Sequence, residues 1–298
     1  MKKILLFMLM VLCIACGKEK EDKIKIGITQ IVEHQSLDDV RQGVIDSLKA
    51  NGYGEDKIEI NYKNAQGDFG TAQIIAQEFK NTSDIVVAIS TPSAQAVVNN
   101  IKDKPIFFAA ITNPESAGVL LENVTGVSDR SPVDKQVKLI KELLPETKKI
   151  GVVYNTSEQN SFYLTDEFKK EAEKNGYEVV IKGITNVNEI ASALDTILPE
   201  IDVLYTTIDN TIASTYPLII DKSKKANKPV IGATKSYVDQ GALASEGISD
   251  YKVGYQTGEM IVRYLKGENI KNMKFEVVRE SERYINKEVA KNFKIIVE

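Results

Sequence analysis

The chain has 298 residues, of which 43% are hydrophobic and 27% charged, so it can build the cores of two lobes of ordinary size. Its 38 Lys and Arg against 42 Asp and Glu give a net charge of −4, which argues against nucleic-acid binding, since phosphate contacts need clustered cations. Both cysteines lie near the N-terminus and His34 is the only histidine, which argues against structural disulfides, thiolate metal sites, most zinc sites and Ser-His-Asp triads.

The N-terminal segment has the anatomy of an export signal. Lys2 and Lys3 precede an apolar run over residues 4–15 that is too short to span a bilayer permanently. The small Ala15 before Cys16 resembles a bacterial lipoprotein signal, which implies cleavage between these residues and lipidation of Cys16. Residues 1–15 would then be the signal peptide and residues 16–22 a tether. The alternative is an ordinary cleaved signal that releases a free protein.

From Lys23 onward, short β-branched runs alternate with longer amphipathic stretches, which is typical of parallel strands joined by helices. In the first half we expect strands over 24–29, 58–64, 85–90, 106–111 and 124–128. The expected helices cover 37–51, 68–81 and 93–100. In the first helix, Val40, Val44 and Leu48 share one face, and Gly52 ends it.

The second half repeats the alternation. A helix over 133–144 closed by Pro145 precedes expected strands over 149–154, 177–184, 203–208 and 229–233. The expected helices between these strands cover 162–175, 187–198 and 212–226. The tail adds a strand over 242–247, a helix over 251–266 and a strand over 275–279, which is more than the second lobe needs.

The pattern predicts an α/β protein of two doubly wound parallel-sheet lobes joined by a multi-crossover hinge. Lobe 1 is expected to comprise 23–130 and 248–280, and lobe 2 to comprise 131–247 and 281–298. The hinge is expected near 128–132, 245–250 and 278–284. Because parallel strands place their carboxyl ends at one edge of a sheet, both lobes would present loops to a cleft between them.

Small polar residues gather at the expected strand-to-helix junctions. Thr91, Pro92 and Ser93 would leave helix N–H groups and hydroxyls facing the cleft, an arrangement suited to a carboxylate; plain capping is the alternative. In lobe 2, the amides and hydroxyls of one junction suit a zwitterion held without a metal. Its candidates are Asn155, Ser157, Asn160 and Ser161.

A third junction adds the carboxylate of Asp209 beside Asn210. Asp209 either neutralises a ligand ammonium or is one more helix cap, and the first role is favoured because Asn210 or Thr211 can supply the cap. Replacing Asp209 with alanine should therefore weaken binding without loss of folding.

The remaining candidates lie in lobe 1. Gln30 and Glu33 follow the first expected strand, whereas His34 reads better as a surface or capping residue. Thr112 follows the fourth strand, and Phe108 is either an apolar wall of the site or part of the core.

Several segments, in this order along the chain, resemble a family of ABC-transporter substrate-binding lipoproteins that includes tryptophan- or aromatic amino-acid-binding proteins of the type I periplasmic-binding-protein fold. They are Val32 to His34, Asn64 to Asp68, Ala88 to Ala96, Phe108 to Pro114, Val124 to Asp129, Tyr154 to Ser161 and Gly241 to Ala244. One departure is Asn113, where the family pattern has aspartate.

The resemblance implies that Thr91 and Ser93 meet a ligand carboxylate, Asp209 meets its amino group, and Asn155, Ser157 and Ser161 close from lobe 2. The implied function is capture of a small zwitterion, foremost an aromatic amino acid (tryptophan, phenylalanine or tyrosine), and delivery to a membrane permease driven by a cytoplasmic ATPase. We expect a monomer with no cofactor, no metal and no catalytic residue.

Other functions remain open at this stage. The same fold could serve as a ligand sensor for a signalling receptor, which sequence alone does not separate from transport. An exported enzyme using a carboxylate pair such as Glu33 and Asp209 is less favoured, since no nucleophile, GxSxG or Walker pattern is present. Branched-chain amino acids, short peptides and other aromatic molecules remain alternative ligands.

Overall fold

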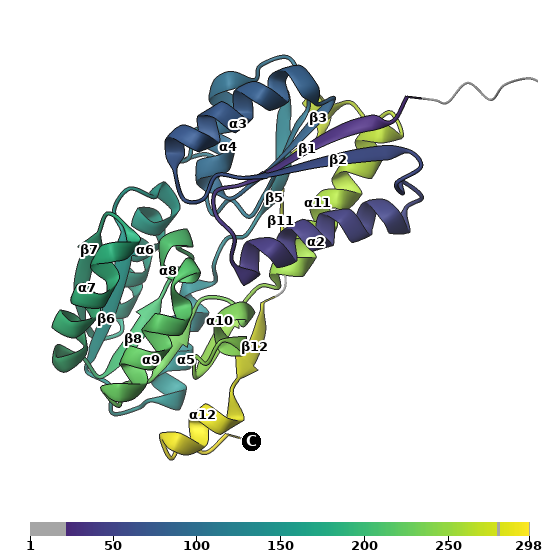
Figure 1. Cartoon of the computed structure of the whole chain (residues 1–298). Coiled ribbons are helices and arrows are strands. Elements are labelled where there is room, and N and C mark those ends of the chain that lie inside the picture. Colours follow the sequence, from purple (N-terminus) through teal and green to yellow (C-terminus); the bar gives the residue numbers. More distant parts are fainter. Residues whose placement is uncertain (1–21, 279–280, 298) are drawn as a thin grey trace, which may run out of the picture.

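The computed structural model describes residues 22–278 and 281–297, in which two six-stranded sheets form two lobes stacked end to end (Figure 1). We call the part built on the first sheet lobe 1 and the part built on the second sheet lobe 2. The predicted signal segment and Cys16 lie outside the described residues.

The sheet of lobe 1 has the strand order β11-β5-β4-β3-β1-β2 and is parallel throughout. The order reverses at β1, so that β2 and β3 lie on either side of it, the arrangement that creates a crevice at the carboxyl ends of the strands. The strands are β1 (Ile24–Gln30), β2 (Ile58–Asn64), β3 (Ile85–Ile89), β4 (Ile106–Ala109), β5 (Val124–Ser128) and β11 (Glu276–Val277).

Helices cover both faces of this sheet, and α2 and α11 run side by side over one of them (Figure 1). One continuous core contains the fully buried Ile26, Val44, Phe79 and Phe107. The helices of lobe 1 are α2 (Gln35–Ala50), α3 (Phe69–Thr82), α4 (Thr91–Asn100) and α11 (Asp250–Leu265), with a 3-10 turn at Ile270–Asn272.

The sheet of lobe 2 has the order β12-β10-β9-β8-β6-β7, in which only β12 pairs antiparallel. Two hydrophobic clusters flank it, one around Tyr216 and Tyr237 and the other around Phe168 and Tyr205. The strands are β6 (Lys149–Asn155), β7 (Glu178–Ile184), β8 (Val203–Thr206), β9 (Val230–Gly232), β10 (Ala244–Gly247) and β12 (Glu282–Ile285).

The helices of lobe 2 depart in places from the expected pattern. The stretch 212–226 is two helices rather than one, because Pro217 lies in the first turn of α9 and cannot donate a backbone N–H into a preceding helix. The expected helix over 187–198 is α7 with a 3-10 turn at each end. The helices are α5 (Val133–Leu143), α6 (Gln159–Lys174), α7 (Ile190–Ile197), α8 (Asn210–Ser214), α9 (Tyr216–Lys225), α10 (Lys235–Asp239) and α12 (Lys287–Asn292).

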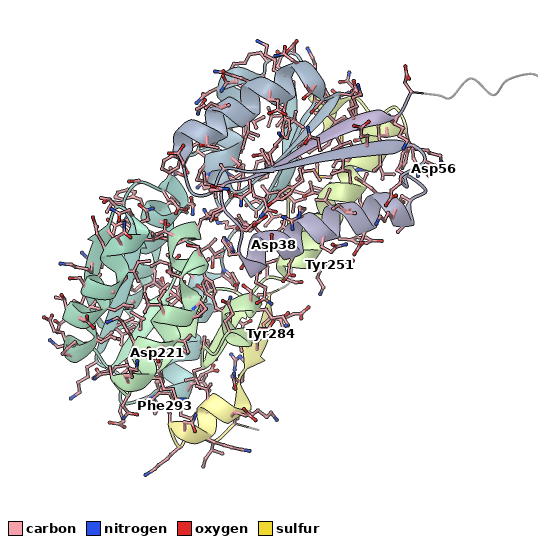
Figure 2. The ribbon with its side chains drawn as sticks, viewed as in Figure 1. Asp38, Asp56, Asp221, Tyr251, Tyr284 and Phe293 are labelled. Atoms are coloured by element: carbon pink, nitrogen blue, oxygen red, sulfur yellow. The ribbon has the colours of Figure 1, made fainter. Side chains whose placement is uncertain are left out.

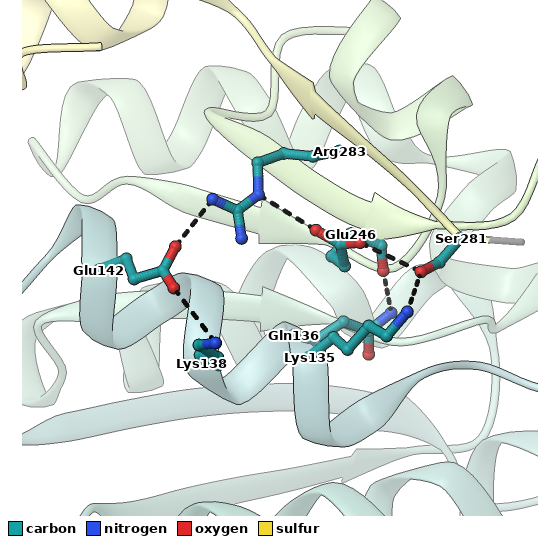
Figure 3. A network of polar contacts seen from close by, with 7 residues as sticks. All are labelled: Lys135, Gln136, Lys138, Glu142, Glu246, Ser281 and Arg283. Atoms are coloured by element: carbon teal, nitrogen blue, oxygen red, sulfur yellow. Dashed lines mark hydrogen bonds and ion pairs between the residues drawn. The ribbon is translucent and has the colours of Figure 1, made fainter. Parts of the chain in front are cut away.

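The described elements require the chain to pass between the sheets after β5, after β10 and after β11. A polar network holds α5, β10 and β12 together beside these passages (Figure 3). Glu246 accepts hydrogen bonds from Ser281 at 3.1 Å and from Arg283 Nε at 3.1 Å, and its carbonyl accepts from Gln136 at 2.9 Å. Arg283 also reaches Glu142 at 2.7 Å. These contacts anchor the lobe 2 ends of the connecting segments.

Candidate functional site

A cavity of about 20 Å³ lies between the lobes, at the carboxyl ends of strands from both sheets. Five of the predicted site residues line it: Thr91, Thr112, Asn160, Asp209 and Asn210. Sequence reasoning missed the other lining residues or left them doubtful: His34, Ser36, Leu37, Ser90, Ala110, Asp129, Ile208, Ala213, Thr234, Tyr237 and Asp250. A space of this size holds about one water molecule, so an amino acid enters only if the surrounding groups move apart.

The lobes touch directly around the cavity. His34 Nε2 at the start of α2 lies 3.3 Å from Asn210 Oδ1 at the start of α8. The hydroxyls of Ser36 and Ser236 are also hydrogen-bonded to each other across the interface. On the rim, Gln159 of lobe 2 donates to the Ser116 hydroxyl of lobe 1 at 2.9 Å. The structure therefore has its two lobes in contact.

Three carboxyl groups line this one small cavity: Asp129, Asp209 and Asp250. Burial raises the pKa of Asp129 to about 6, and burial followed by the nearby charge of Glu158 raises that of Asp209 to about 7. Burial and then the charge of Asp129 hold the pKa of Asp250 well above its usual value. Desolvated carboxylates that repel one another favour a cation between them, so the cavity is suited to a positively charged group.

Asp209 also has a structural role. It is the N-cap of α8, where Oδ1 accepts from the Ile212 N–H at 2.9 Å, and Oδ2 accepts from the Asn155 N–H at 2.6 Å. Asp209 is thus the helix cap, the alternative that the sequence left open. The favoured prediction that Asn210 or Thr211 caps this helix is wrong, because the side chain of the last residue before the helix is the one placed to accept from the free N–H groups of the first turn.

This double role changes the expected effect of Asp209→Ala. Loss of the cap and of the acceptor for the buried Asn155 N–H should lower the free energy of unfolding by about 2–4 kcal/mol. Urea unfolding measures this value, and Asp68→Ala is the matched control, because Asp68 caps α3 through Thr71 at an exposed position and should cost only about 1 kcal/mol. Equal losses for the two variants would contradict this role.

Glu158 is a buried carboxylate, only 3% exposed, that ties the start of α8 to the β6–α6 loop. It accepts from the backbone N–H groups of Asn210 and Thr211, both at 3.1 Å, and from the Thr211 hydroxyl at 2.9 Å. The Asn210 side-chain amide donates to it at 2.5 Å. Glu158 thus satisfies the N-terminus of α8 and fixes the orientation of Asn210, which faces lobe 1.

Five polar atoms of the cavity wall are buried and lack a hydrogen-bond partner among the described residues. They are His34 Nδ1, Asp129 Oδ1, Asn160 Oδ1 and the hydroxyl oxygens of Thr91 and Thr112. Burial lowers the pKa of His34 to about 4, so its ring is neutral near pH 7. Because buried polar atoms are normally paired, the unpaired acceptors point to a ligand that donates hydrogen bonds.

The strand ends of lobe 1 carry backbone strain at the same place. Ser90 has a φ of 84° and Ala110 a φ of 56°, a region that residues with a Cβ rarely adopt, and both line the cavity. Ser90, the N-cap residue of α4, makes no side-chain capping hydrogen bond, and the first turn of α4 contains Thr91, Pro92 and Ser93. The Ser93 hydroxyl accepts from Ser90 at 3.5 Å and lies outside the cavity wall, whereas Thr91 Oγ1 lines the cavity without a partner among the described residues. The free helix start at Thr91 favours a carboxylate.

Other predicted site residues of lobe 1 lie outside the cavity wall. Gln30 is fully buried and bonded to Arg41, Asp38 and the Val32 carbonyl, and Glu33 is exposed and accepts from Tyr62 at 3.0 Å. Phe108 is fully buried and packs against Phe275.

The same holds for predicted residues of lobe 2. Asn155 is buried and donates to the Thr211 hydroxyl at 2.7 Å, whereas Ser157 is exposed beside it. Ser161 is buried in the first turns of α6, which begins at Gln159, three residues earlier than expected.

Neither a metal cluster nor a membrane span is found in the part of the chain that the structure describes. No group of three or more His, Cys, Asp or Glu side chains within 22–278 and 281–297 is placed to hold a metal ion. Over the same residues, no helix combines the length and hydropathy that crossing a bilayer requires.

Several known proteins are similar to this chain in sequence and in structure. The chain is 42% identical over 274 residues to a tyrosine-binding protein of Clostridioides difficile, covering 89% of this chain and 79% of that protein. A Streptococcus pneumoniae domain solved in complex with L-Trp has a TM-score of 0.89 at 37% identity, covering 93% of this chain and 96% of that one. A ligand-free, open substrate-binding protein with adhesive properties from Clostridium difficile has a TM-score of 0.69 at 42% identity, covering 92% and 96%.

The sequence profile of ABC transporter substrate-binding proteins matches residues 25–298. The two-sheet fold is that of type I periplasmic binding proteins, which confirms the fold predicted from the sequence. Proteins of this family are extracytoplasmic and bind solutes without transforming them. The chain belongs to the family of ABC transporter substrate-binding proteins.

Proposed function

We propose that this protein captures an aromatic amino acid, tyrosine or tryptophan foremost, between its lobes and delivers it to an ABC permease driven by a cytoplasmic ATPase. The observation that carries the proposal is the interlobe cavity, in which buried acceptors lack partners. Its closely related proteins support the class of ligand, since one is a tyrosine-binding protein and another was solved with L-Trp.

The ammonium of such a ligand fits the acceptor side of the cavity. Three of the unpaired atoms in the cavity wall, His34 Nδ1, Asp129 Oδ1 and Asn160 Oδ1, can each accept a hydrogen bond from an ammonium group. Asp129 is a better counter-ion than Asp209, because both oxygens of Asp209 already accept backbone N–H groups. The ligand charge would also relieve the repulsion between Asp129 and Asp250.

The carboxylate and the side chain of the ligand have their own partners. The Thr91 hydroxyl and the uncapped start of α4 are suited to the carboxylate, with Thr112 close by in the cavity wall. Leu37, Ile208 and the ring of Tyr237 supply apolar contacts for an aromatic side chain.

The same comparison supports closure of the lobes around the ligand. The fold overlaps the L-Trp complex better than the ligand-free open structure, with TM-scores of 0.89 and 0.69, although sequence identity is higher to the open protein. This order is what a rigid-body movement of the lobes between an open and a closed form would produce. We place the hinge at 128–132, 245–250 and 278–284, so that lobe 1 comprises 23–130 and 248–280 and lobe 2 the remainder of 131–298.

We further propose that the protein acts as a monomer held at the outer face of a membrane by lipid on Cys16. Two or more acyl chains at this cysteine would anchor the chain stably, and residues 16–22 would tether the lobes. Metabolic labelling with a fatty-acid analogue should mark the wild-type chain, and Cys16→Ser should remove the label.

A thermal-shift screen of the purified protein against the twenty amino acids tests the ligand, with calorimetry on each hit. A ligand present at one hundred times its dissociation constant should stabilise the native state by about 2.7 kcal/mol. We expect a response to tyrosine, tryptophan or phenylalanine and none to glutamate or lysine. A response to branched-chain amino acids alone, or to no amino acid, would overturn the assignment.

A further inference from the structure

His34 connects the two lobes at the edge of the cavity. It precedes α2, whose N-terminal end points toward lobe 2 (Figure 1), and its Nε2 lies 3.3 Å from Asn210 Oδ1. The partners are 176 residues apart in the sequence and belong to different sheets. The contact therefore exists only when the lobes are together.

The orientation of the Asn210 amide follows from Glu158. A carboxylate accepts hydrogen bonds but donates none, so the group that lies 2.5 Å from Glu158 Oε2 must be the amide nitrogen of Asn210. Glu158 is itself held by the backbone N–H and the hydroxyl of Thr211. The oxygen of Asn210 must then face His34.

This chain of hydrogen bonds selects one form of the imidazole. Because Asn210 offers an acceptor, His34 must donate through Nε2–H, and a neutral ring then has a free lone pair on Nδ1. The low pKa of the buried ring, about 4, is consistent with the neutral form. Nδ1 is buried and has no hydrogen-bond partner within residues 22–278 and 281–297, and His34 lines the cavity.

We propose that His34 has two roles. Its Nε2–H donates a hydrogen bond to Asn210 across the cleft, a contact between the lobes that we call the latch. Its Nδ1 accepts a hydrogen bond from the ligand ammonium. This inference rests on the proposed function and identifies how that site couples binding to closure. A neutral Nδ1 has no proton to offer a carboxylate, so it selects for the amino group. An aromatic acid that lacks the amino group should therefore bind poorly.

The single histidine of the chain allows a direct test. Protein labelled with 15N only in histidine and carrying no histidine tag gives the two nitrogen signals of His34 alone. In protein saturated with the amino acid found by calorimetry, we expect the Nε2-protonated neutral form. The Nδ1 signal should also shift between the free and saturated protein. An Nδ1-protonated ring, or an Nδ1 signal unchanged by a ligand that binds, would overturn the inference.

Two substitutions separate the two roles. His34→Gln can place an amide nitrogen near the Nε2 position, so it should keep the latch, close normally in X-ray scattering and lose about tenfold or more in affinity. His34→Asn can place an amide oxygen near the Nδ1 position, so it should keep the ligand contact, losing about two- to tenfold in affinity through faster dissociation. Equal affinity of both variants and wild type would contradict the proposal.

The outcome also separates this inference from the proposed function. If the wild-type protein binds no aromatic amino acid in calorimetry, the proposed function fails. If it binds one with the His34 signals unchanged and the two variants indistinguishable from wild type, only the role of His34 fails.

Discussion

Replacing Asp129 with asparagine is expected to raise the dissociation constant for an aromatic amino acid by about 100-fold, since truncating one partner of a buried charge pair costs several kcal/mol. Asp129 follows β5 where the chain leaves lobe 1, is only 3% exposed and lines the cavity with an oxygen that no described residue hydrogen-bonds. Asparagine keeps the shape but removes the charge that faces the ligand ammonium. Calorimetry at pH 7.5 measures the change.

The pH dependence of ligand affinity is a second test of the role of Asp129. Burial raises the pKa of Asp129 to about 6, so its protonated form dominates at lower pH and offers no charge to an ammonium. Its contribution to ligand affinity should therefore fall by up to about tenfold for each pH unit below 6. The affinity of Asp129→Asn should fall less steeply over this range.

As pH falls, the contribution of Asp129 to the stability of the ligand-free protein should rise, whereas its contribution to ligand affinity falls. Folded Asp129 binds a proton more tightly than the unfolded chain, so its contribution to stability is complete below pH 3.8 and is lost as pH rises through about 6. The pKa of His34 is lowered to about 4, so its contribution to the stability of the fold is instead lost as pH falls below 6.5. The difference in free energy of unfolding between wild type and Asp129→Asn isolates the aspartate.

The matched control is Asp56→Asn. Asp56 is exposed in the turn before β2, at the end of lobe 1 far from lobe 2 (Figure 2). This variant loses the same formal charge without touching the cavity, so its affinity should equal that of wild type. If Asp129→Asn also bound as tightly as wild type, Asp129 would not be the counter-ion.

The regular part of the fold could be predicted from sequence, because its strands and helices bury long apolar patterns. The core strand β3 is buried along its length, and α2 buries Val40, Val44 and Leu48 together. The pieces that sequence reasoning missed are α10, α12 and β12, which are short and partly polar. Their structure depends on partners far along the chain, such as β10 for β12.

The site was only partly predictable for a related reason. Thr91, Thr112 and Asn160 follow parallel strands, and the position of a strand end is readable from its apolar run. The same signal also marks Glu33 and Ser157, which are exposed, because a polar residue in a loop can face the cavity or the solvent.

Asp129 and Asp250 were missed because each belongs to a passage between the lobes rather than to a strand-to-helix loop within one lobe. The available signal for Asp129 was an acidic residue directly after the buried strand β5. No comparable local signal marked Tyr237, which reaches the cavity from the short helix α10.

Replacing Gly254 with alanine is expected to lower the free energy of unfolding by about 3 kcal/mol, the upper part of the range for overpacked interiors. Helix propensity alone predicts the opposite sign, because alanine is better than glycine in a helix interior by about 1 kcal/mol. Steric overlap decides the sign, because a Cβ on Gly254 would lie far inside van der Waals contact distance of the Val40 carbonyl oxygen of α2. Gly43 and Gly258 keep the same two helices close in the same way.

The effect of Gly254→Ala should extend to the ligand site, because α2 begins beside His34 and Ser36 while α11 begins with Asp250. Forcing the two helices apart moves lining groups that belong to one cavity, so ligand affinity should fall together with stability. Gly70→Ala in α3 is the control, since its Cβ would meet only the end of the Asp68 side chain, at 3.2 Å. Urea unfolding and calorimetry of both variants measure these effects, and an unfolding free energy for Gly254→Ala at or above that of wild type would show that α2 and α11 can separate without strain.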